Sequence, residues 1–147
     1  EFDYIIQVNL ASAFTLTREC VKRMRLRRRG SVLFISSMTG LFGMEKVLAY
    51  GTSKTAVIGM LRAMVMEYSA FNVRVNALAP GWIQSDMLEQ ALRTDEERKN
   101  KIISRIPFKR FGTGEDIGQA AVFLSSDAAA YVTGVVLPVD GGAAYAF

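Results

Sequence analysis

Ser31-Val-Leu-Phe-Ile-Ser36 is a short, nearly continuous apolar run that separates a basic segment from a loop containing glycine. A run of this kind is expected for a strand whose two faces are both buried. A second such run, Asn72-Val-Arg-Val-Asn-Ala-Leu-Ala79, ends at Pro80-Gly81, and a third covers residues 134–139 before a turn over 140–142. The three runs predict strands of a parallel sheet that is covered by helices on both sides.

The segments between these strands have the apolar spacing of helices. We expect long helices over residues 3–28 and 48–70, and a shorter one that starts at Thr113 or Gly114 and continues to about Ser125. The first of these should stop at its arginine-rich end and Gly30. Residues 38–47 are expected to form a loop, and the charged residues 85–104 to form a helical insertion, which we call the flap. This order predicts an α/β fold with right-handed crossovers.

Length and composition exclude several classes of protein. The 147 residues are 50% hydrophobic and 22% charged, which is typical of one globular domain or a large piece of one. No apolar run is long enough to span a membrane. The single cysteine, Cys20, and the absence of histidine exclude internal disulfides, a Cys/His zinc site and a Ser-His-Asp triad. We therefore expect a cytoplasmic protein without a metal site.

The net charge of +4 comes from one local cluster. Six of the eighteen basic residues lie together: Lys22, Arg23, Arg25, Arg27, Arg28 and Arg29. Without them, twelve basic residues face fourteen acidic ones, a balance of −2. We interpret the cluster as a solvated helix C-terminus, where cations complement the helix dipole, and a patch for an anion or a partner is the alternative. No aromatic residues alternate with the arginines, so nucleic-acid binding is not expected.

Tyr50 and Lys54 carry the strongest chemical signal. They lie four residues apart at the predicted start of a helix, so their side chains share one face. A phenol titrates at about pH 10, and a neighbouring ammonium lowers that pKa, so the pair can exchange a proton with a reacting oxygen. Ser37 follows the first strand at its carboxyl end, where ligands bind in such sheets, and its hydroxyl could reach the same oxygen. By itself, this spacing is also typical of a surface tyrosine beside a solvated lysine.

Further segments occur together in an order and spacing that resemble one family. They are Asn9 in VNL, ISS ending at Ser37, YGTSK over 50–54, VRVNALAPGWIQSDM over 73–87, RFGTGEDI over 110–117, AVFLSSDAAAYVTG over 121–134 and VDGG over 139–142. Together they resemble the C-terminal part of a short-chain dehydrogenase/reductase of the short, tetrameric kind, and the resemblance covers the whole chain. The chain is similar both to reductases of 3-oxoacyl thioesters and to dehydrogenases of sugar acids such as gluconate, and the motifs do not separate these substrates.

This resemblance implies a role for each catalytic position. Tyr50 would be the general acid/base at the substrate carbonyl or alcohol oxygen, and Ser37 would orient and polarise that carbonyl. Lys54 would lower the pKa of the tyrosine and hold the nicotinamide ribose. Asn9 would bind a water that links Lys54 into a proton relay, although an asparagine at such a place is otherwise a helix-surface amide.

The resemblance also implies NAD or NADP as the cofactor. Tyr50 and Lys54 would contact it, Pro80 and Gly81 would flank the nicotinamide, and the backbone N–H of Ile83 would bind its carboxamide. Ser85 stands where the family usually has threonine, and its hydroxyl can still donate to a phosphate or the carboxamide. The flap and residues 41–44 would shape the substrate pocket, and Trp82 would either line that pocket or plug it.

The family's N-terminal motifs, including the glycine loop Thr-Gly-x-x-x-Gly-x-Gly, do not occur in this sequence. We therefore expect residues 1–147 to be the C-terminal catalytic part of one doubly wound, Rossmann-like domain, with three strands and flanking helices and without the dinucleotide-binding half. On its own, such a chain should bind nicotinamide cofactors very weakly.

Two interpretations of the chain follow. In the first, it is part of a complete NAD(P)-dependent oxidoreductase acting on a small carbonyl compound or alcohol. In the second, it is a non-catalytic remnant that self-associates. Strand 31–36 would then expose an edge, and exposed edges invite pairing with another chain. In the family, the helices predicted over 3–28 and 48–70 build a dimer interface, so we expect a homodimer or homotetramer.

Overall fold

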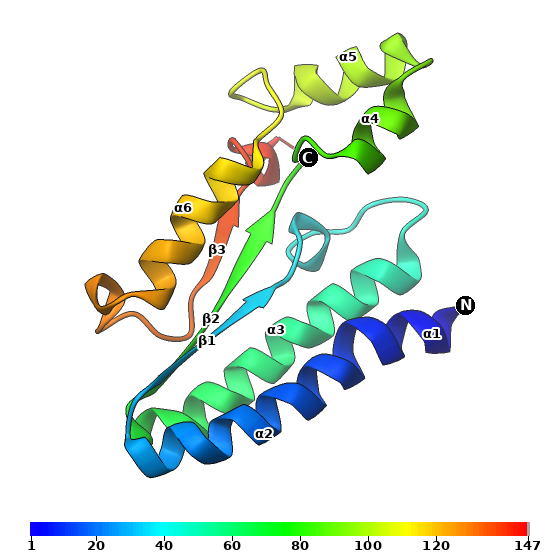
Figure 1. Cartoon of the computed structure of the whole chain (residues 1–147). Coiled ribbons are helices and arrows are strands. Elements are labelled where there is room, and N and C mark those ends of the chain that lie inside the picture. The colour runs from blue at the N-terminus through cyan, green and yellow to red at the C-terminus, as the bar shows by residue number, and fades with distance from the viewer. Residues whose placement is uncertain (147) are drawn as a thin grey trace.

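The computed structural model describes residues 1–146, which form one parallel sheet between two layers of helices (Figure 1). The elements in chain order are α1 (Phe2–Ile6), the π-helix η1 (Gln7–Ala11), α2 (Ser12–Arg27), β1 (Gly30–Ile35), the 3-10 helix η2 (Met38–Gly40), α3 (Leu48–Tyr68), η3 (Ser69–Phe71), β2 (Val73–Pro80), α4 (Asp86–Leu92), α5 (Glu96–Arg105), α6 (Gly114–Ser125), η4 (Asp127–Ala129), β3 (Val136–Val139) and η5 (Ala143–Tyr145). The predicted order of three strands with flanking helices is confirmed.

The three strands pair in the order β1-β2-β3, and both pairings are parallel. The register places Ile35 beside Leu78 and Pro80 beside Val139, so the carboxyl ends of the strands lie at one end of the sheet. Within residues 1–146, β1 has no partner on its other side. The prediction that this strand forms an edge is therefore confirmed for the described residues.

Successive side chains of the strands point to opposite faces, and each face has its own helices. Val32 and Phe34 of β1 pack in the core under α2 and α3. Ser31 points the other way, toward α6, and its Oγ donates to the Leu124 carbonyl oxygen over 3.3 Å. Arg74 of β2 lies on this second face too, with its guanidinium on the same carbonyl at 2.7 Å. Helices on both faces explain why the strands carry nearly continuous apolar runs.

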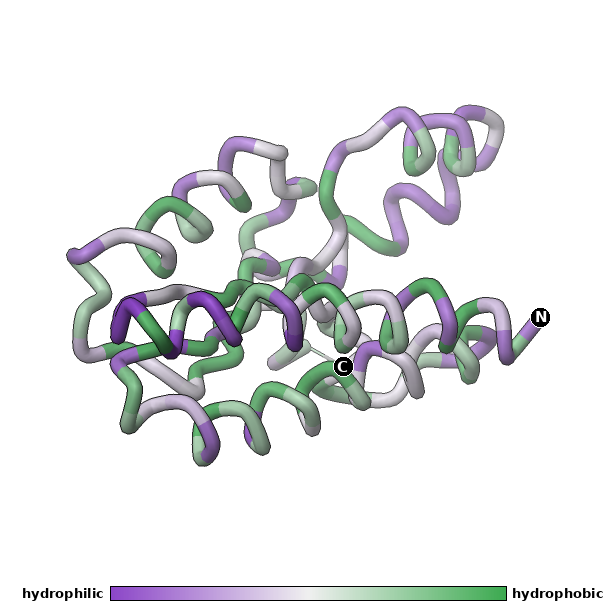
Figure 2. The backbone as a smooth tube through the Cα atoms, turned by 60° about the horizontal axis from the view of Figure 1, so that its bottom comes forward, coloured by the Kyte–Doolittle hydropathy of each residue, from purple (hydrophilic) through white to green (hydrophobic). Residues whose placement is uncertain are grey.

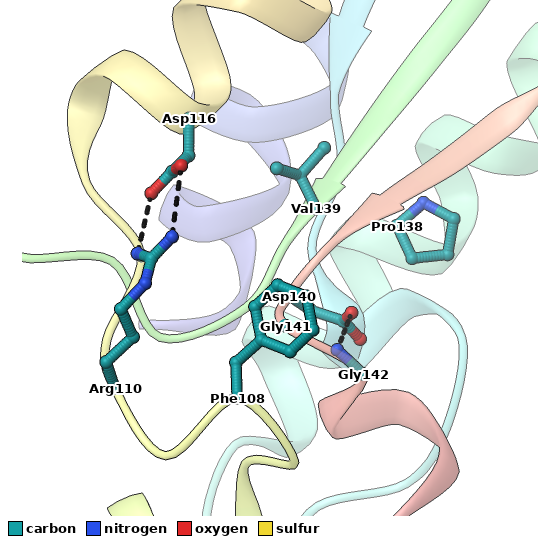
Figure 3. A pocket seen from close by; sticks show the side chains of 9 residues that line it. Phe108, Arg110, Asp116, Pro138, Val139, Asp140, Gly141 and Gly142 are labelled. Atoms are coloured by element: carbon teal, nitrogen blue, oxygen red, sulfur yellow. Dashed lines mark hydrogen bonds and ion pairs between the residues drawn. The ribbon is translucent and has the colours of Figure 1, made fainter.

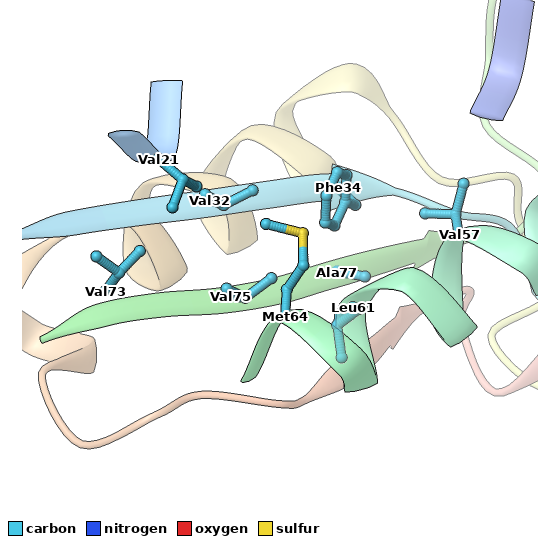
Figure 4. Packing of buried hydrophobic residues seen from close by; sticks show 9 residues of the cluster. All are labelled: Val21, Val32, Phe34, Val57, Leu61, Met64, Val73, Val75 and Ala77. Carbon is cyan, nitrogen blue, oxygen red and sulfur yellow. The ribbon is translucent and has the colours of Figure 1, made fainter. Parts of the chain in front are cut away.

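The main core lies between α2, α3 and the sheet (Figure 4). Its buried members are Val21, Val32, Phe34, Val57, Leu61, Met64, Val73, Val75 and Ala77. Leu61 is 0% exposed at the centre of this cluster. Figure 2 shows apolar residues along much of α3, whereas hydrophilic residues gather on the flap and at the end of α2.

The first predicted helix is interrupted by the π-helix η1, and the flap forms two helices, α4 and α5. The flap breaks because Asp95 caps α5, with its side chain accepting from the Arg98 backbone N–H over 2.9 Å. No pattern of apolar residues indicates the π-helix, since it changes the helical register by a single residue.

The helix α2 ends at Arg27, three residues before the predicted stop at Gly30. Its C-cap is Arg28, which takes the left-handed conformation at φ +49°. Asn72 donates its Nδ2 to the Arg28 carbonyl oxygen, and Arg28 Nη2 donates to the Ala70 carbonyl oxygen, both over 3.0 Å. These contacts between two neighbouring turns stabilise the unusual backbone at Arg28.

Candidate functional site

The predicted site residues gather where the strands end. Ser37 follows β1, Pro80 is the last residue of β2, and α3 begins at the same end of the sheet because it runs back against the strand direction (Figure 1). Contacts between Lys54 of α3 and the end of β1 fix this arrangement. In parallel α/β sheets, this end is where ligands bind.

Tyr50 and Lys54 lie on the same face of α3, as the spacing predicts. The Lys54 Nζ is 5.6 Å from the centre of the Tyr50 ring and donates to the Ile35 carbonyl oxygen over 3.0 Å. Burial lowers the pKa of Lys54, because desolvation disfavours its charged form. Tyr50 is 38% exposed, and its hydroxyl has no hydrogen-bond partner among residues 1–146. The phenol is therefore accessible to a ligand beside a cation.

The Ile35 carbonyl that holds Lys54 lies on the open edge of β1. The Ser36 N–H donates to the Leu78 carbonyl oxygen on β2 over 2.8 Å. Since consecutive backbone groups of a strand point to opposite sides, the Ile35 carbonyl points away from β2. The ammonium thus satisfies a carbonyl that has no strand partner in the described part of the chain.

The two serines after β1 have different surroundings. Ser36 is 2% exposed, and its Oγ donates to the Lys54 carbonyl oxygen over 2.9 Å, so it fastens α3 to the sheet. This agrees with its interpretation as a hydrogen-bonded strand residue. Ser37 caps η2, where its Oγ accepts from the Thr39 N–H over 3.2 Å. The hydroxyl hydrogen of Ser37 is then available for donation to a ligand, and no hydrogen bond joins Ser37 to Tyr50 within residues 1–146.

Asn9 lies inside the π-helix η1 and connects to the start of α3. Its Nδ2 donates to Ser53 Oγ over 3.0 Å, and Ser53 Oγ donates to the Tyr50 carbonyl oxygen over 2.7 Å. Single π-turns within α-helices are frequent at functional sites. Ser53 is fully buried, and the sequence interpretation did not single it out. The predicted link from Asn9 to Lys54 through a water stays a prediction.

The chain after β2 is fixed from two sides. The Gly81 N–H donates to the Val139 carbonyl oxygen over 3.1 Å, and a Cβ at Gly81 would come within 2.6 Å of the Asp140 Cβ, so this approach requires glycine. Ile83 then forms a parallel bridge with Gly112. The bridge uses the Trp82 carbonyl and the Gln84 N–H, so the N–H of Ile83 itself points away from Gly112.

Ser85 begins the flap as the N-cap of α4. Its Oγ accepts from the Leu88 N–H over 3.2 Å, and the residue is exposed. The structure therefore places Ser85 at the rim of the site, with its oxygen used for capping and its hydroxyl hydrogen available.

A second apolar cluster lies beyond the strand ends and joins the loop after β1, the flap and the C-terminal turn. Its members are Met38, Ile106 and Ala143, with Phe42, Met44, Trp82, Ile102 and Phe111 packed against them. Trp82 therefore belongs to this cluster, and its Nε1 is buried without a hydrogen-bond partner within the described chain, as is Thr39 Oγ1. Beside the cluster, a cavity of about 380 Å³ between the loop and α3 is lined by Thr39, Phe42, Met44 and Thr52, among others.

A separate groove lies between α2 and α3, away from the strand ends. Its volume is about 650 Å³. It is lined by Leu10, Ala11, Phe14, Thr15, Thr17, Arg18, Ala56, Met60, Ala63, Met64, Glu67 and Tyr68. Phe14 at its margin is 52% exposed. The apolar faces expected for these two helices are thus present on the described surface.

Within residues 1–146, no group of three or more His, Cys, Asp or Glu side chains is arranged to hold a metal ion. None of the described helices combines the length and the apolar character needed to cross a membrane.

Comparisons with known proteins agree with these observations. A family model described as enoyl-(acyl carrier protein) reductase matches residues 1–144. A 3-oxoacyl-[acyl-carrier-protein] reductase of Thermotoga maritima is 40% identical over 142 residues, which cover 97% of this chain and 56% of that protein. A 2-dehydro-3-deoxy-D-gluconate 5-dehydrogenase of Pseudoalteromonas atlantica is 45% identical over 141 residues, covering 96% of this chain and 55% of that protein.

A crystal structure from Beutenbergia cavernae has the same arrangement, with a TM-score of 0.92 and 44% sequence identity. It is of a protein assigned as an NAD(P)-dependent gluconate 5-dehydrogenase, with NADP bound at low occupancy. The match covers 97% of this chain and 57% of that protein. The chain therefore spans a little over half the length of the relatives it matches.

Proposed function

The chain belongs to the short-chain dehydrogenase/reductase family, and from this membership we propose that it carries the acid–base residues of an NAD(P)-dependent oxidoreductase. The reaction would interconvert a carbonyl compound and a secondary alcohol. The observation that carries the proposal is the accessible phenol of Tyr50, which lies beside the Lys54 ammonium at the carboxyl end of the sheet.

In this proposal, Tyr50 gives its proton to the carbonyl oxygen during reduction and takes it back from the alcohol during oxidation. The cofactor, when bound, supplies or accepts the hydride. Ser37 donates its free hydroxyl hydrogen to the same oxygen and orients the substrate. Lys54 brings a positive charge next to the phenol. Asn9 holds the start of α3 through Ser53. We propose that it also binds the water of the proton relay.

The residues present fit the nicotinamide end of the cofactor. Ile83 has a backbone N–H that the bridge to Gly112 leaves free, and it can donate to the carboxamide. Gly81 has no side chain to block a planar ring, and Pro80 beside it gives a rigid wall. Lys54 can exchange its contact with the Ile35 carbonyl for the ribose hydroxyls. Ser85, at the rim, would donate its hydroxyl to a phosphate or the carboxamide.

We propose two substrate classes for the first assays, 3-oxoacyl thioesters and keto sugar acids, and other carbonyl compounds stay open. The relatives named above include both activities. The space for the substrate would lie between the loop after β1 and the flap, beside Trp82. The free thiol of Cys20 is exposed, which suits a reducing compartment, and we place the protein in the cytoplasm.

Turnover tests this proposal directly. Because the sequence lacks a glycine-rich phosphate loop, the assay joins the chain to the nucleotide-binding half of a solved relative. We expect oxidation of NADH or NADPH that depends on one of the two substrate classes, followed by absorbance and by mass spectrometry of the alcohol product. A folded hybrid protein that binds the cofactor but reduces no carbonyl compound from either class would refute the proposed reaction.

We also propose that α2 and α3 form a homodimer interface, the first contact of a dimer or tetramer. The groove between them is apolar, and Phe14 is exposed beside it. A self-associating chain without catalysis, the alternative interpretation, would use the same surface.

An Ala63→Glu variant tests this interface. The exposed Ala63 lines the groove, and a longer, charged side chain there would have to lose its water on association. We expect light scattering after gel filtration to show a dimer or tetramer for the wild type and a monomer for this variant. Ala91→Glu, a matched change at an exposed position of α4, should keep the wild-type mass. A wild-type mass for both variants would place the interface elsewhere.

A further inference from the structure

The base of the flap is closed by a short segment, Arg110–Asp116, which we call the strap. The strap follows α5, includes the first residues of α6 and runs beside Trp82–Gln84, where the flap begins. The Gly112 N–H donates to the Trp82 carbonyl oxygen over 2.9 Å, and the Gln84 N–H donates to the Gly112 carbonyl oxygen over 2.8 Å. These two hydrogen bonds tie the start of the flap to its end.

The same two bonds set the direction of the Ile83 backbone. A residue whose neighbours both bond to one partner must turn its own N–H to the opposite side. On its N-terminal side, this segment is already fixed, since Gly81 is bonded to Val139 at the end of β3. The orientation of the Ile83 N–H therefore depends on whether Gly112 stays in place.

Asp116 contacts the chain on both sides of Gly112, and Figure 3 shows one of these contacts, the ion pair with Arg110. Asp116 Oδ2 accepts from Arg110 Nη1 over 2.9 Å, from the Thr113 N–H over 2.7 Å and from Thr113 Oγ1 over 3.0 Å. A further contact joins Arg110 Nη2 to Asp116 Oδ1 at 3.4 Å. Arg110 and Thr113 lie on either side of Gly112, so both flanks of the bridging residue are attached to one carboxylate.

The two attachments differ in chemistry, although they share the Asp116 carboxylate. Thr113 and Asp116 form a capping box, in which Thr113 Oγ1 also accepts from the Asp116 N–H over 3.2 Å. Arg110 instead makes a two-pronged ion pair, and its Nη1 also donates to the Phe111 carbonyl oxygen over 3.0 Å. Hydrogen bonding from Arg110, and then from Thr113, holds the pKa of Asp116 well below its usual range. The carboxylate is therefore charged at neutral pH, and its ion pair can be removed without removing the helix cap.

We propose that Arg110 and Asp116 are positioning residues that aim the Ile83 N–H at the nicotinamide carboxamide by holding the strap against Trp82–Gln84. The inference rests on the cofactor role proposed above for Ile83. Neither side chain touches the cofactor in this scheme, and both act through the backbone of Gly112.

An Arg110→Gln variant of the chain tests the inference, since it removes the ion pair and leaves the capping box intact. Arg98→Gln on α5 is the matched control, because it removes the same charge from the flap at an exposed residue. We expect amide hydrogen exchange at Gln84 and Gly112 to become about fivefold faster in Arg110→Gln, the upper range for an exposed ion pair. Exchange at Val75 in the core strand should not change, which distinguishes a local effect from general destabilisation.

The proposed contact between Ile83 and the cofactor is tested with nicotinamide mononucleotide. This compound carries only the nicotinamide half of the cofactor, which is the half that this chain would bind. Millimolar nicotinamide mononucleotide should shift the Ile83 amide resonance of the wild type, with about fivefold weaker binding to Arg110→Gln and unchanged binding to Arg98→Gln. Asp116→Asn should weaken binding at least as much as Arg110→Gln, since it removes the ion pair and also weakens the capping box that holds Thr113.

The outcomes separate the two proposals. Wild-type affinity in Arg110→Gln, with a normal response at Ile83, would overturn the positioning role and leave the proposed function intact. No response of the Ile83 amide in the wild type would overturn the cofactor role of Ile83, and the positioning role with it.

Discussion

Replacing Tyr50 by phenylalanine should lower the turnover number by about 10²–10⁴-fold, the usual contribution of a general acid/base, with little change in cofactor affinity. The change removes one oxygen and keeps the aromatic ring on α3. The fold should not suffer, because the Tyr50 hydroxyl makes no hydrogen bond within residues 1–146. The measurement is the rate of NAD(P)H oxidation at saturating substrate in the hybrid protein described above, together with a fluorescence titration of the cofactor.

Tyr131→Phe is the matched control for this experiment. Tyr131 is fully exposed between α6 and β3, at the end of the sheet where the strands begin. Its loss of a hydroxyl should leave the turnover number within a factor of about two. If Tyr50→Phe retained turnover equal to that of Tyr131→Phe, the proton donor would be another group, and the assignment of Tyr50 would be wrong.

The second large effect concerns stability. A Leu61→Ala variant should lower the free energy of unfolding by about 2–5 kcal/mol, because it leaves a cavity at the centre of the main core. Leu61 is completely buried between α3 and the sheet (Figure 4). Urea denaturation followed by circular dichroism measures the change, provided that the slope of the transition is the same in both proteins.

The control is Met66→Ala, five residues further along α3. Met66 is 84% exposed, so its truncation leaves no cavity and should change the free energy of unfolding by no more than about 0.5 kcal/mol. Similar losses in the two variants would mean that packing of α3 on the sheet contributes little. The cluster around Leu61 would then not be the main stabilising core of the protein.

The strands were predictable because their apolar runs are short and bounded by clear signals. Residues 31–36 precede a loop with glycines, and 72–79 precede Pro80-Gly81, which closely matches the observed bounds of β1 and β2. The face shared by Tyr50 and Lys54 was also predictable, since it depends only on helical periodicity.

The less predictable features depend on contacts between distant segments. Ser53 joins Asn9 to Tyr50, and nothing local to Ser53 indicates that a helix residue 44 positions earlier in the chain brings an amide to it. The bridge between Ile83 and Gly112 likewise joins the two ends of a long insertion. One part of the strap did carry a signal, since Thr113 and Asp116 have the spacing of a capping box. The partner of that carboxylate, Arg110, was indicated by no pattern.

The contact between Lys54 and the open edge of β1 has a consequence for solubility. Unpaired strand edges are templates for edge-to-edge aggregation, and natural proteins protect them with lysine side chains placed along the edge. Lys54 comes from α3 rather than from the strand, yet its ammonium donates a hydrogen bond to the Ile35 carbonyl oxygen on that edge. The lysine that we propose for the chemistry would thereby also protect β1 against misassembly whenever this strand has no neighbour.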